Sequence, residues 1–201
     1  MNLYDSMNEC LSTVYAHCEN AGDYAIKREG ETLKIFFECS DGKEDWRNNF
    51  KFLAIPWKAY KEMNHVWFCH RGFLRVWKSI KPYIEADILN PEIKQIEIVG
   101  YSHGAAIALL CYEYAKFNRP MVDVYGVGFG CPRVFWGFVS QKVKDRFKNF
   151  KVVRNGNDIV THVPPALFGF RHISTVIKIG QTNPVKDHYD SEYLLRLKEL
   201  Q

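Results

Sequence analysis

The stretch Ile98-Val99-Gly100-Tyr101-Ser102-His103-Gly104-Ala105-Ala106 decides the fold of this chain. Residues 93–99, which lead into it, are rich in β-branched side chains and predict a short buried strand. Residues 104–117, which leave it, are rich in alanine and leucine and predict a helix. A strand that enters the pattern G-x-S-x-G and a helix that leaves it are typical of a sharp turn that presents a serine at the carboxyl end of a sheet.

The two glycines of this turn have a steric role. Side chains at Gly100 and Gly104 would collide with neighbouring chain where the strand turns into the helix. The turn exposes the Oγ of Ser102. It also places the N–H of His103 at the N-terminus of the new helix, where unpaired donors and the helix dipole favour an oxyanion. The alternative interpretation is a glycine-rich turn that holds an ordinary serine.

Strand and helix patterns alternate along the rest of the chain. Helices are expected over residues 3–18, 72–88 and 188–200, with one more within 132–147, and strands over 32–39, 122–129, 150–154 and 173–179. This alternation predicts an α/β fold with a mostly parallel central sheet and helices on both faces. Since no linker or repeat divides the sequence, we expect residues 1–201 to form a single domain.

The composition excludes several classes of protein. The chain has 201 residues, 47% of them hydrophobic and 25% charged, and a net charge of +4. These values are typical of a folded protein rather than a disordered chain. The weak charge, without a basic run, gives no expectation of nucleic-acid binding. The longest apolar run, residues 105–112, is far shorter than the roughly 18 residues that a membrane span needs, so no transmembrane segment is expected.

The first residues and the cysteines predict a location. Residues 1–5 carry neither the basic cluster nor the apolar run of a signal peptide. The six cysteines form no C-x-x-C pair, so we expect buried free thiols and no bound metal or cofactor. Together these features predict a cytoplasmic protein.

A catalytic serine needs a base, and the base needs an acid that orients it. In proteins with this kind of turn, the acid and then the histidine follow the serine along the chain. His188 follows the last expected strand, where such a base usually lies, and His162 and His172 are the other candidates. Asp158 follows the strand 150–154 in a turn-forming stretch, although an aspartate there can also be only a turn residue. The competing acids are Asp123, Asp187 and Asp190.

Further motifs accompany the serine turn. Residues 35–40 read Ile-Phe-Phe-Glu-Cys-Ser, residues 45–49 read Asp-Trp-Arg-Asn-Asn, and residues 70–73 read His-Arg-Gly-Phe. Residues 129–134 read Phe-Gly-Cys-Pro-Arg-Val, residues 155–165 run from Asn-Gly-Asn-Asp to Pro-Pro, and residues 187–194 begin with Asp-His and end with Tyr-Leu. In this order, over residues 32–195, the motifs resemble those of the class 3 lipase family, the fungal-lipase-like α/β-hydrolases.

The resemblance implies an α/β-hydrolase fold and a role for each matching position. Ser102 matches the family's nucleophile, Asp158 its acid and His188 its base. Ser40 matches the first oxyanion donor, and His103 matches the second. The segment 41–50, where the family places its lid, is mostly polar here, so we expect weak or absent activation at a lipid interface.

The resulting hypothesis is a serine esterase or lipase that hydrolyses carboxylic esters, either acylglycerol-like or small, through an acyl-enzyme. The expected partner is a small-molecule ester or lipid, with transient contact to a lipid surface as a further option. The alternatives are the same triad acting on an amide or as an acyltransferase, and a non-catalytic binding protein on a hydrolase fold. Residues 164–170 either line an apolar groove or cap the core. Other aromatic residues are expected in the core or on a helix face, namely Trp67, Phe135, Trp136 and Phe138.

Overall fold

The central element is a large, mostly parallel sheet. The computed structural model describes residues 2–18, 22–38, 54–57, 67–138, 140–180 and 186–201. Seven of the described strands form one sheet in the order β1-β2-β3-β6-β7-β9-β11, in which β3 to β11 are parallel and β1 and β2 are antiparallel additions at one edge. Their bounds are Ala16–Cys18 (β1), Gly22–Glu29 (β2), Thr32–Glu38 (β3), Gln95–Tyr101 (β6), Asp123–Phe129 (β7), Phe150–Asn155 (β9) and Thr175–Ile179 (β11).

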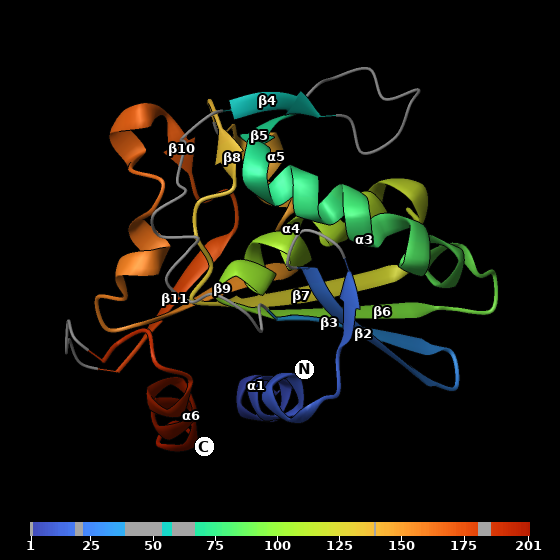
Figure 1. Cartoon of the computed structure of the whole chain (residues 1–201), viewed down its shortest axis with the longest axis horizontal. Coiled ribbons are helices and arrows are strands. Elements are labelled where there is room, and N and C mark those ends of the chain that lie inside the picture. The colour runs from blue at the N-terminus through green and yellow to red at the C-terminus, as the bar shows by residue number, and fades with distance from the viewer. Residues whose placement is uncertain (1, 19–21, 39–53, 58–66, 139, 181–185) are drawn as a thin grey trace.

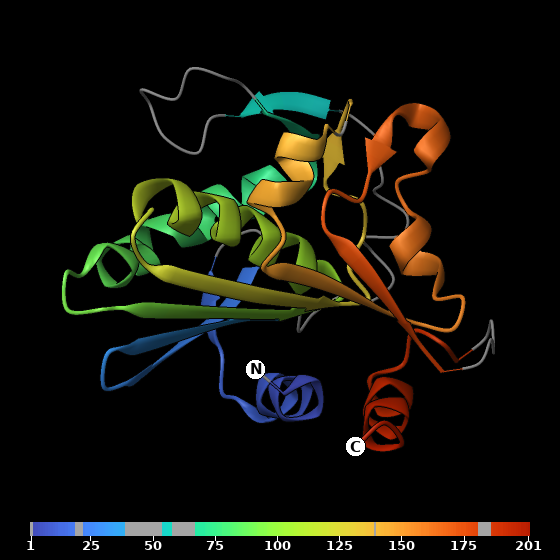
Figure 2. The ribbon, with the colours of Figure 1, turned by 180° about the vertical axis from the view of Figure 1, so that it is seen from behind.

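Helices cover both faces of this sheet, as Figures 1 and 2 show from opposite sides. The helices α3 (Arg71–Leu89) and α4 (His103–Asn118) pack on one face, and α1 (Leu3–Ser12) and α6 (Asp190–Lys198) pack on the other. The expected α/β architecture with helices on both faces is therefore confirmed. The described residues form two hydrophobic cores, one on each side of the sheet.

Alternation along β3 shows how the sequence builds these two cores. Leu33, Ile35 and Phe37 face α3 and α4, whereas Phe36 faces α1 and α6. Successive side chains of a strand point to opposite faces, so a continuous apolar run fills both cores at once. All four of these side chains are buried.

A second, smaller sheet lies beyond α3 and α4 (Figure 1). Its strands are paired antiparallel in the order β10-β8-β5-β4, next to the short helix α5. The bounds are Ala54–Trp57 (β4), Trp67–His70 (β5), Phe135–Trp136 (β8), Gln141–Arg146 (α5) and Phe170–Arg171 (β10).

Two elements differ from the sequence-based expectation. The helix expected over residues 3–18 ends at Ser12, because Thr13 is already extended, and Ala16–Cys18 forms β1 instead. The helix expected within 132–147 is only the single turn and a half of α5, because β8 uses the first part of that segment. Among the described helices, none combines the length and the apolar character that crossing a bilayer requires.

Candidate active site

Ser102 lies in a strained turn between β6 and α4. Its φ is 55° and its ψ is −122°, and it is the one described non-glycine residue with a positive φ. Side chains rarely adopt this backbone conformation, so surrounding contacts must hold it. One such contact is the hydrogen bond that the Ser102 N–H donates to the carbonyl oxygen of Phe129 at 2.8 Å, which ties the turn to the end of β7.

The glycines on either side allow the turn to close. A Cβ on Gly104 would lie 2.2 Å from the carbonyl oxygen of Phe37 and 2.8 Å from the backbone nitrogen of Glu38, at the end of β3. A Cβ on Gly100 would lie 2.5 Å from the carbonyl oxygen of Gly104. All three distances are far below van der Waals contact, so the first turn of α4 can lie against β3 and β6 only when both positions are glycine.

The turn brings Ser102 into contact with a histidine and an aspartate that follow much later in the chain. The Oγ of Ser102 lies 2.8 Å from Nε2 of His188, and Nδ1 of His188 lies 2.8 Å from Oδ2 of Asp158. The carboxylate accepts the Nδ1 proton, so Nε2 is left to accept the serine proton. The structure thus brings together the three side chains that the sequence singled out.

The carboxylate of Asp158 is fully buried and has several donors. Oδ1 accepts from the N–H of Val160 at 2.9 Å, and Oδ2 accepts from the hydroxyl of Tyr193 at 2.7 Å as well as from His188. A buried charge needs such partners, since its desolvation is otherwise very unfavourable. Burial, followed by the adjacent Asp158 carboxylate, raises the pKa of Tyr193 well above its ordinary value, so its hydroxyl keeps its proton and acts as donor.

Asp187, a competing candidate for the acid, instead connects the two loops of the site. Its Oδ2 accepts from the N–H of Asn157 at 2.7 Å, and its carbonyl oxygen accepts from the side-chain amide of Asn155 at 3.1 Å. It directly precedes His188, so these bonds hold the loop of the base against the loop of Asp158. Asp123 and Asp190 lie at the start of β7 and of α6, and neither bonds to His188.

Two residues that sequence reasoning did not single out support the base. The hydroxyl of Tyr101 donates to the carbonyl oxygen of His188, and the two rings stack with centroids 5.4 Å apart. Gly130, with a φ of 60°, leaves space that a Cβ would fill at 2.9 Å from Oδ2 of Asp158 and 3.0 Å from Cε1 of His188. Both residues belong to motifs that the sequence displays, the G-x-S-x-G turn and Phe-Gly-Cys-Pro-Arg-Val, but their roles depend on contacts across the sheet.

The other two candidate bases lie elsewhere. Nδ1 of His162 lies 3.0 Å from the carbonyl oxygen of Asp158, and Nε2 of His172 lies 2.8 Å from the carbonyl oxygen of Thr161. Burial, with smaller contributions from nearby arginines, lowers the pKa of His172 to about 4. Both rings are thus held by backbone carbonyl groups of the loop that follows Asp158, and neither bonds to Ser102.

Of the two expected oxyanion donors, His103 lies within the described residues. His103 begins α4 directly after Ser102, so its N–H is among the first-turn amides that have no partner within the helix. Its imidazole packs against the ring of Phe73, and burial, then the nearby His70, lowers its pKa to about 4. Ser40 and the lid segment 41–50 lie outside the described residues. Across the part of the chain that is described, His, Cys, Asp and Glu form no group of three suited to a metal ion.

Comparison with known proteins identifies the family of this chain. A family model described as lipase (class 3) matches residues 34–168. The chain belongs to the class 3 lipase family. A secreted mono- and diacylglycerol lipase from Fusarium solani is 31% identical over 65% of this chain and 38% of its own length, and one from Malassezia restricta is 32% identical over 58% and 39%. This class 3 lipase chain therefore spans about two fifths of the length of these curated relatives.

Solved structures show the same fold. The triacylglyceride lipase of Rhizomucor miehei superimposes with a TM-score of 0.67 at 21% identity, over 82% of this chain and 66% of that one. The predicted α/β-hydrolase fold is confirmed by this similarity.

The relatives contradict one prediction. The similar lipases from Fusarium solani and Malassezia restricta are named as secreted proteins, so the prediction of a cytoplasmic protein is wrong. That prediction relied on residues 1–5 and on cysteine spacing. Neither can report on location in a chain that covers about two fifths of the length of these relatives.

Proposed function

We propose that this chain hydrolyses carboxylic esters through an acyl-enzyme, with Ser102 as nucleophile, His188 as base and Asp158 as the acid that orients the base. The observation that carries the proposal is the continuous chain of contacts from Ser102 Oγ to His188 Nε2 and from His188 Nδ1 to Asp158 Oδ2, each of 2.8 Å. The backbone strain at Ser102 supports it, because such strain persists mainly where function requires it.

The proposed reaction has two halves. His188 takes the proton of Ser102 as Oγ attacks the carbonyl carbon, and it then passes that proton to the leaving alcohol as the acyl-enzyme forms. The same imidazole then takes a proton from water as the water oxygen attacks the acyl carbonyl carbon, and it returns that proton to Oγ of Ser102 as the carboxylic acid leaves. The N–H of His103 is one proposed donor to the oxyanion, and the N–H of Ser40 is the second.

Acylglycerol-type esters are the proposed substrates, because the similar proteins from Fusarium solani and Malassezia restricta are named mono- and diacylglycerol lipases. A lipid substrate of this kind implies transient contact with a lipid surface. The polar composition of residues 41–50 still predicts that activity rises little when the substrate passes from solution into an emulsion.

The test combines active-site labelling with ester hydrolysis. A fluorophosphonate probe should label the wild-type chain and should not label Ser102→Ala. The control variant Ser12→Ala, which changes an exposed serine, should be labelled as the wild type is. In a series of p-nitrophenyl esters and acylglycerols, Ser102→Ala and His188→Ala should each lower kcat by at least about 10⁴-fold.

The outcomes separate the competing functions. Labelling of Ser102→Ala at the wild-type level would show that another residue is the nucleophile. An unlabelled wild-type chain would overturn the enzyme assignment in favour of a binding protein on a hydrolase fold. A labelled chain that cleaves no ester of the series would favour an amide substrate or transfer of the acyl group to an acceptor other than water.

A further inference from the structure

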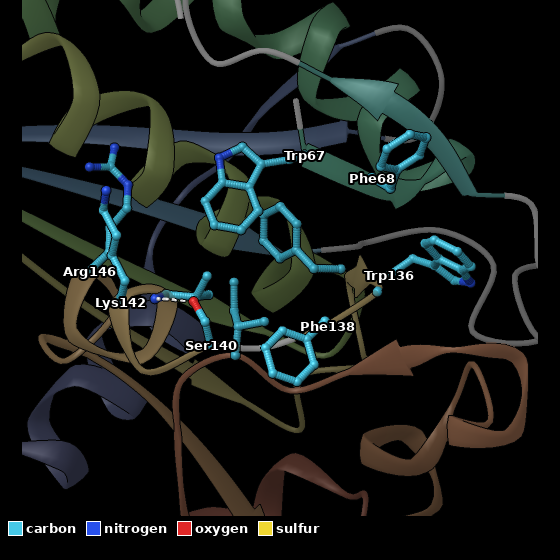
Figure 3. A pocket seen from close by; sticks show the side chains of 11 residues that line it. Trp67, Phe68, Trp136, Phe138, Ser140, Lys142 and Arg146 are labelled. Atoms are coloured by element: carbon cyan, nitrogen blue, oxygen red, sulfur yellow. Dashed lines mark hydrogen bonds between the residues drawn. The ribbon is translucent and has the colours of Figure 1, made fainter. Parts of the chain in front are cut away.

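An open apolar pocket lies at the smaller sheet, away from the serine. It has a volume of about 480 Å³ and lies between β5, β8 and α5 (Figure 3), and Ile173 also lines it. This volume is within the range of sites for small organic ligands, roughly 300–1,000 Å³. Most of its lining is aromatic or aliphatic, including Trp67, Phe135, Phe138 and Val143.

The pocket is separate from the proposed catalytic site. Ser102, Asp158 and His188 are not among its lining residues. The pocket wall contacts α4 at Glu113, whose Oε1 accepts a hydrogen bond from Nε1 of Trp67 at 3.1 Å. Glu113 lies ten residues after the start of α4 at His103, which at 1.5 Å per residue is roughly 15 Å along the helix axis.

Phe68, Trp136 and Phe138 form an aromatic wall of the pocket that is partly exposed to solvent. Nε1 of Trp136 donates to the carbonyl oxygen of Phe168 at 2.7 Å, and its ring makes an edge contact with Phe68 at a centroid distance of 5.9 Å. Nevertheless Phe138 is 92% exposed, and Trp136 and Phe68 are 46% and 43% exposed. Large aromatic side chains gathered around a hollow in this way favour an apolar ligand.

One edge of the pocket is basic. Lys142 and Arg146, one turn apart on α5, lie at the edge opposite Trp136 (Figure 3). Nε of Arg146 donates to both carboxylate oxygens of Glu113, at 3.0 and 2.7 Å. Its Nη2 is buried and has no hydrogen-bond partner among the described residues. Since Glu113 neutralises Arg146, Lys142 gives this edge a net positive charge, and Nη2 offers a donor in need of an acceptor.

We propose that this pocket binds a single-chain carboxylate amphiphile, a free fatty acid. The acyl chain lies among Trp67, Phe135 and Phe138, and the carboxylate lies at Lys142, on the side of the pocket that Arg146 lines. A cationic head would be repelled at this edge, and a neutral head would leave Lys142 without a counter-ion. Fatty acids are also the product class of the proposed ester hydrolysis, but binding here does not depend on that activity.

Direct binding tests the proposal without any hydrolysis. Dodecanoate, dodecanol and dodecyltrimethylammonium, each below its micelle concentration, are titrated into the full chain while calorimetric heat and tryptophan fluorescence are recorded. Dodecanoate should bind at least about tenfold more tightly than dodecanol, and the cation more weakly still. Dodecanol binding as tightly as dodecanoate would overturn the proposed carboxylate site.

Variants locate the site. Val143→Trp, which fills the pocket, should weaken dodecanoate binding by at least about tenfold, and Lys142→Ala by about fivefold. Lys144→Ala on the same helix is the matched control, because this exposed lysine does not line the pocket, and it should bind as the wild type does.

A second apolar change covers the case in which Val143→Trp does not fold. Phe138→Ser removes a side chain that is 92% exposed, so folding should be retained while dodecanoate affinity falls about threefold. Unchanged affinity in both folded Val143→Trp and Phe138→Ser would place the fatty acid elsewhere. Binding to anionic phospholipid vesicles without any binding of dodecanoate would overturn the proposal in favour of a membrane-docking face.

Discussion

The two ends of α4 place polar groups by different means. At the N-terminal end, backbone contacts hold Ser102 in its conformation with a φ of 55°. Its N–H donates a hydrogen bond to the carbonyl oxygen of Phe129, and Gly104 packs closely against β3. At the C-terminal half, Glu113 is held by side chains, through Trp67 and Arg146. Between them every residue from Gly104 to Ala115 is buried, so one rigid helix carries both arrangements.

This difference predicts which substitutions each end of α4 tolerates. A site fixed by backbone contact does not tolerate one added methyl group, because the chain itself must move. A site fixed by an ion pair should lose stability when one partner is changed, but the helix and everything at its other end should stay in place. Variants at Gly104 and Glu113 test this contrast, and the effect at Gly104 should be the larger.

Gly104→Ala should lower both stability and activity. The new Cβ would lie 2.2 Å from the carbonyl oxygen of Phe37, so α4 and β3 must separate. We expect the free energy of unfolding to fall by about 3 kcal/mol. We also expect kcat to fall by about 100-fold, because displacement of the serine by about 1 Å has an effect of that size. Denaturant unfolding and ester kinetics measure the two effects.

Ala108→Gly in the middle of the same helix is the control for Gly104→Ala. It should lower the free energy of unfolding by about 1 kcal/mol through helix propensity, with kcat unchanged. Wild-type kcat in Gly104→Ala would show that the close approach of α4 and β3 does not position Ser102.

Glu113→Gln should lower stability alone. Burial raises the pKa of Glu113, and its hydrogen bonds from Arg146 and Trp67 offset this only in part. Loss of the carboxylate leaves the Arg146 guanidinium without its ion-pair partner, but a side-chain exposure of 26% lets water compensate. We therefore expect a decrease of about 2 kcal/mol in the free energy of unfolding, with kcat unchanged.

Glu92→Gln provides the matched comparison for Glu113→Gln. Glu92 forms an ion pair with Arg28 at 2.6 Å on an exposed surface. Loss of this ion pair should leave the free energy of unfolding unchanged. A tenfold loss of kcat in Glu113→Gln would contradict the separation of the two ends of α4, since it would show that the ion pair reaches the serine.

The same contrast explains what the sequence could predict. The serine turn is a local pattern, since Gly100, Ser102 and Gly104 lie within five residues and the strand before them and the helix after them have clear periodicity. The α/β class followed from alternation of strands and helices. The positions of Asp158 and His188 could be proposed only because chain order restricts them.

The smaller sheet and its pocket could not be predicted. The strands β8 and β10 have two residues each, too short for any alternation to be visible. Trp136 and Phe138 were expected in the core or on a helix face, yet both are exposed, and Trp136 pairs with Phe68 of β5. Apolar character alone does not distinguish a core residue from the wall of an open pocket, because the difference lies in which distant segments meet there.

The smallest expected loss of stability among these predictions comes from a tyrosine that bonds to the proposed acid. The hydroxyl of Tyr193 accepts from the N–H of Asn155 at 3.1 Å and donates to Oδ2 of Asp158 at 2.7 Å. Tyr193→Phe removes both bonds but keeps the ring that fills the core. The buried N–H loses its acceptor, and the carboxylate keeps only the donors from Val160 and His188.

We expect Tyr193→Phe to lower the free energy of unfolding by about 1–2 kcal/mol. Ester kcat should fall about tenfold with KM unchanged, because a carboxylate with one donor fewer holds the imidazole of His188 less firmly. Tyr112→Phe is the matched control. Tyr112 is also buried and its hydroxyl donates to the carbonyl oxygen of Arg146 at 3.2 Å, far from the serine. Tyr112→Phe should lower the free energy of unfolding by a similar amount with no change in kcat. Equal losses of kcat in the two variants would show that Tyr193 acts only through general stability and does not position Asp158.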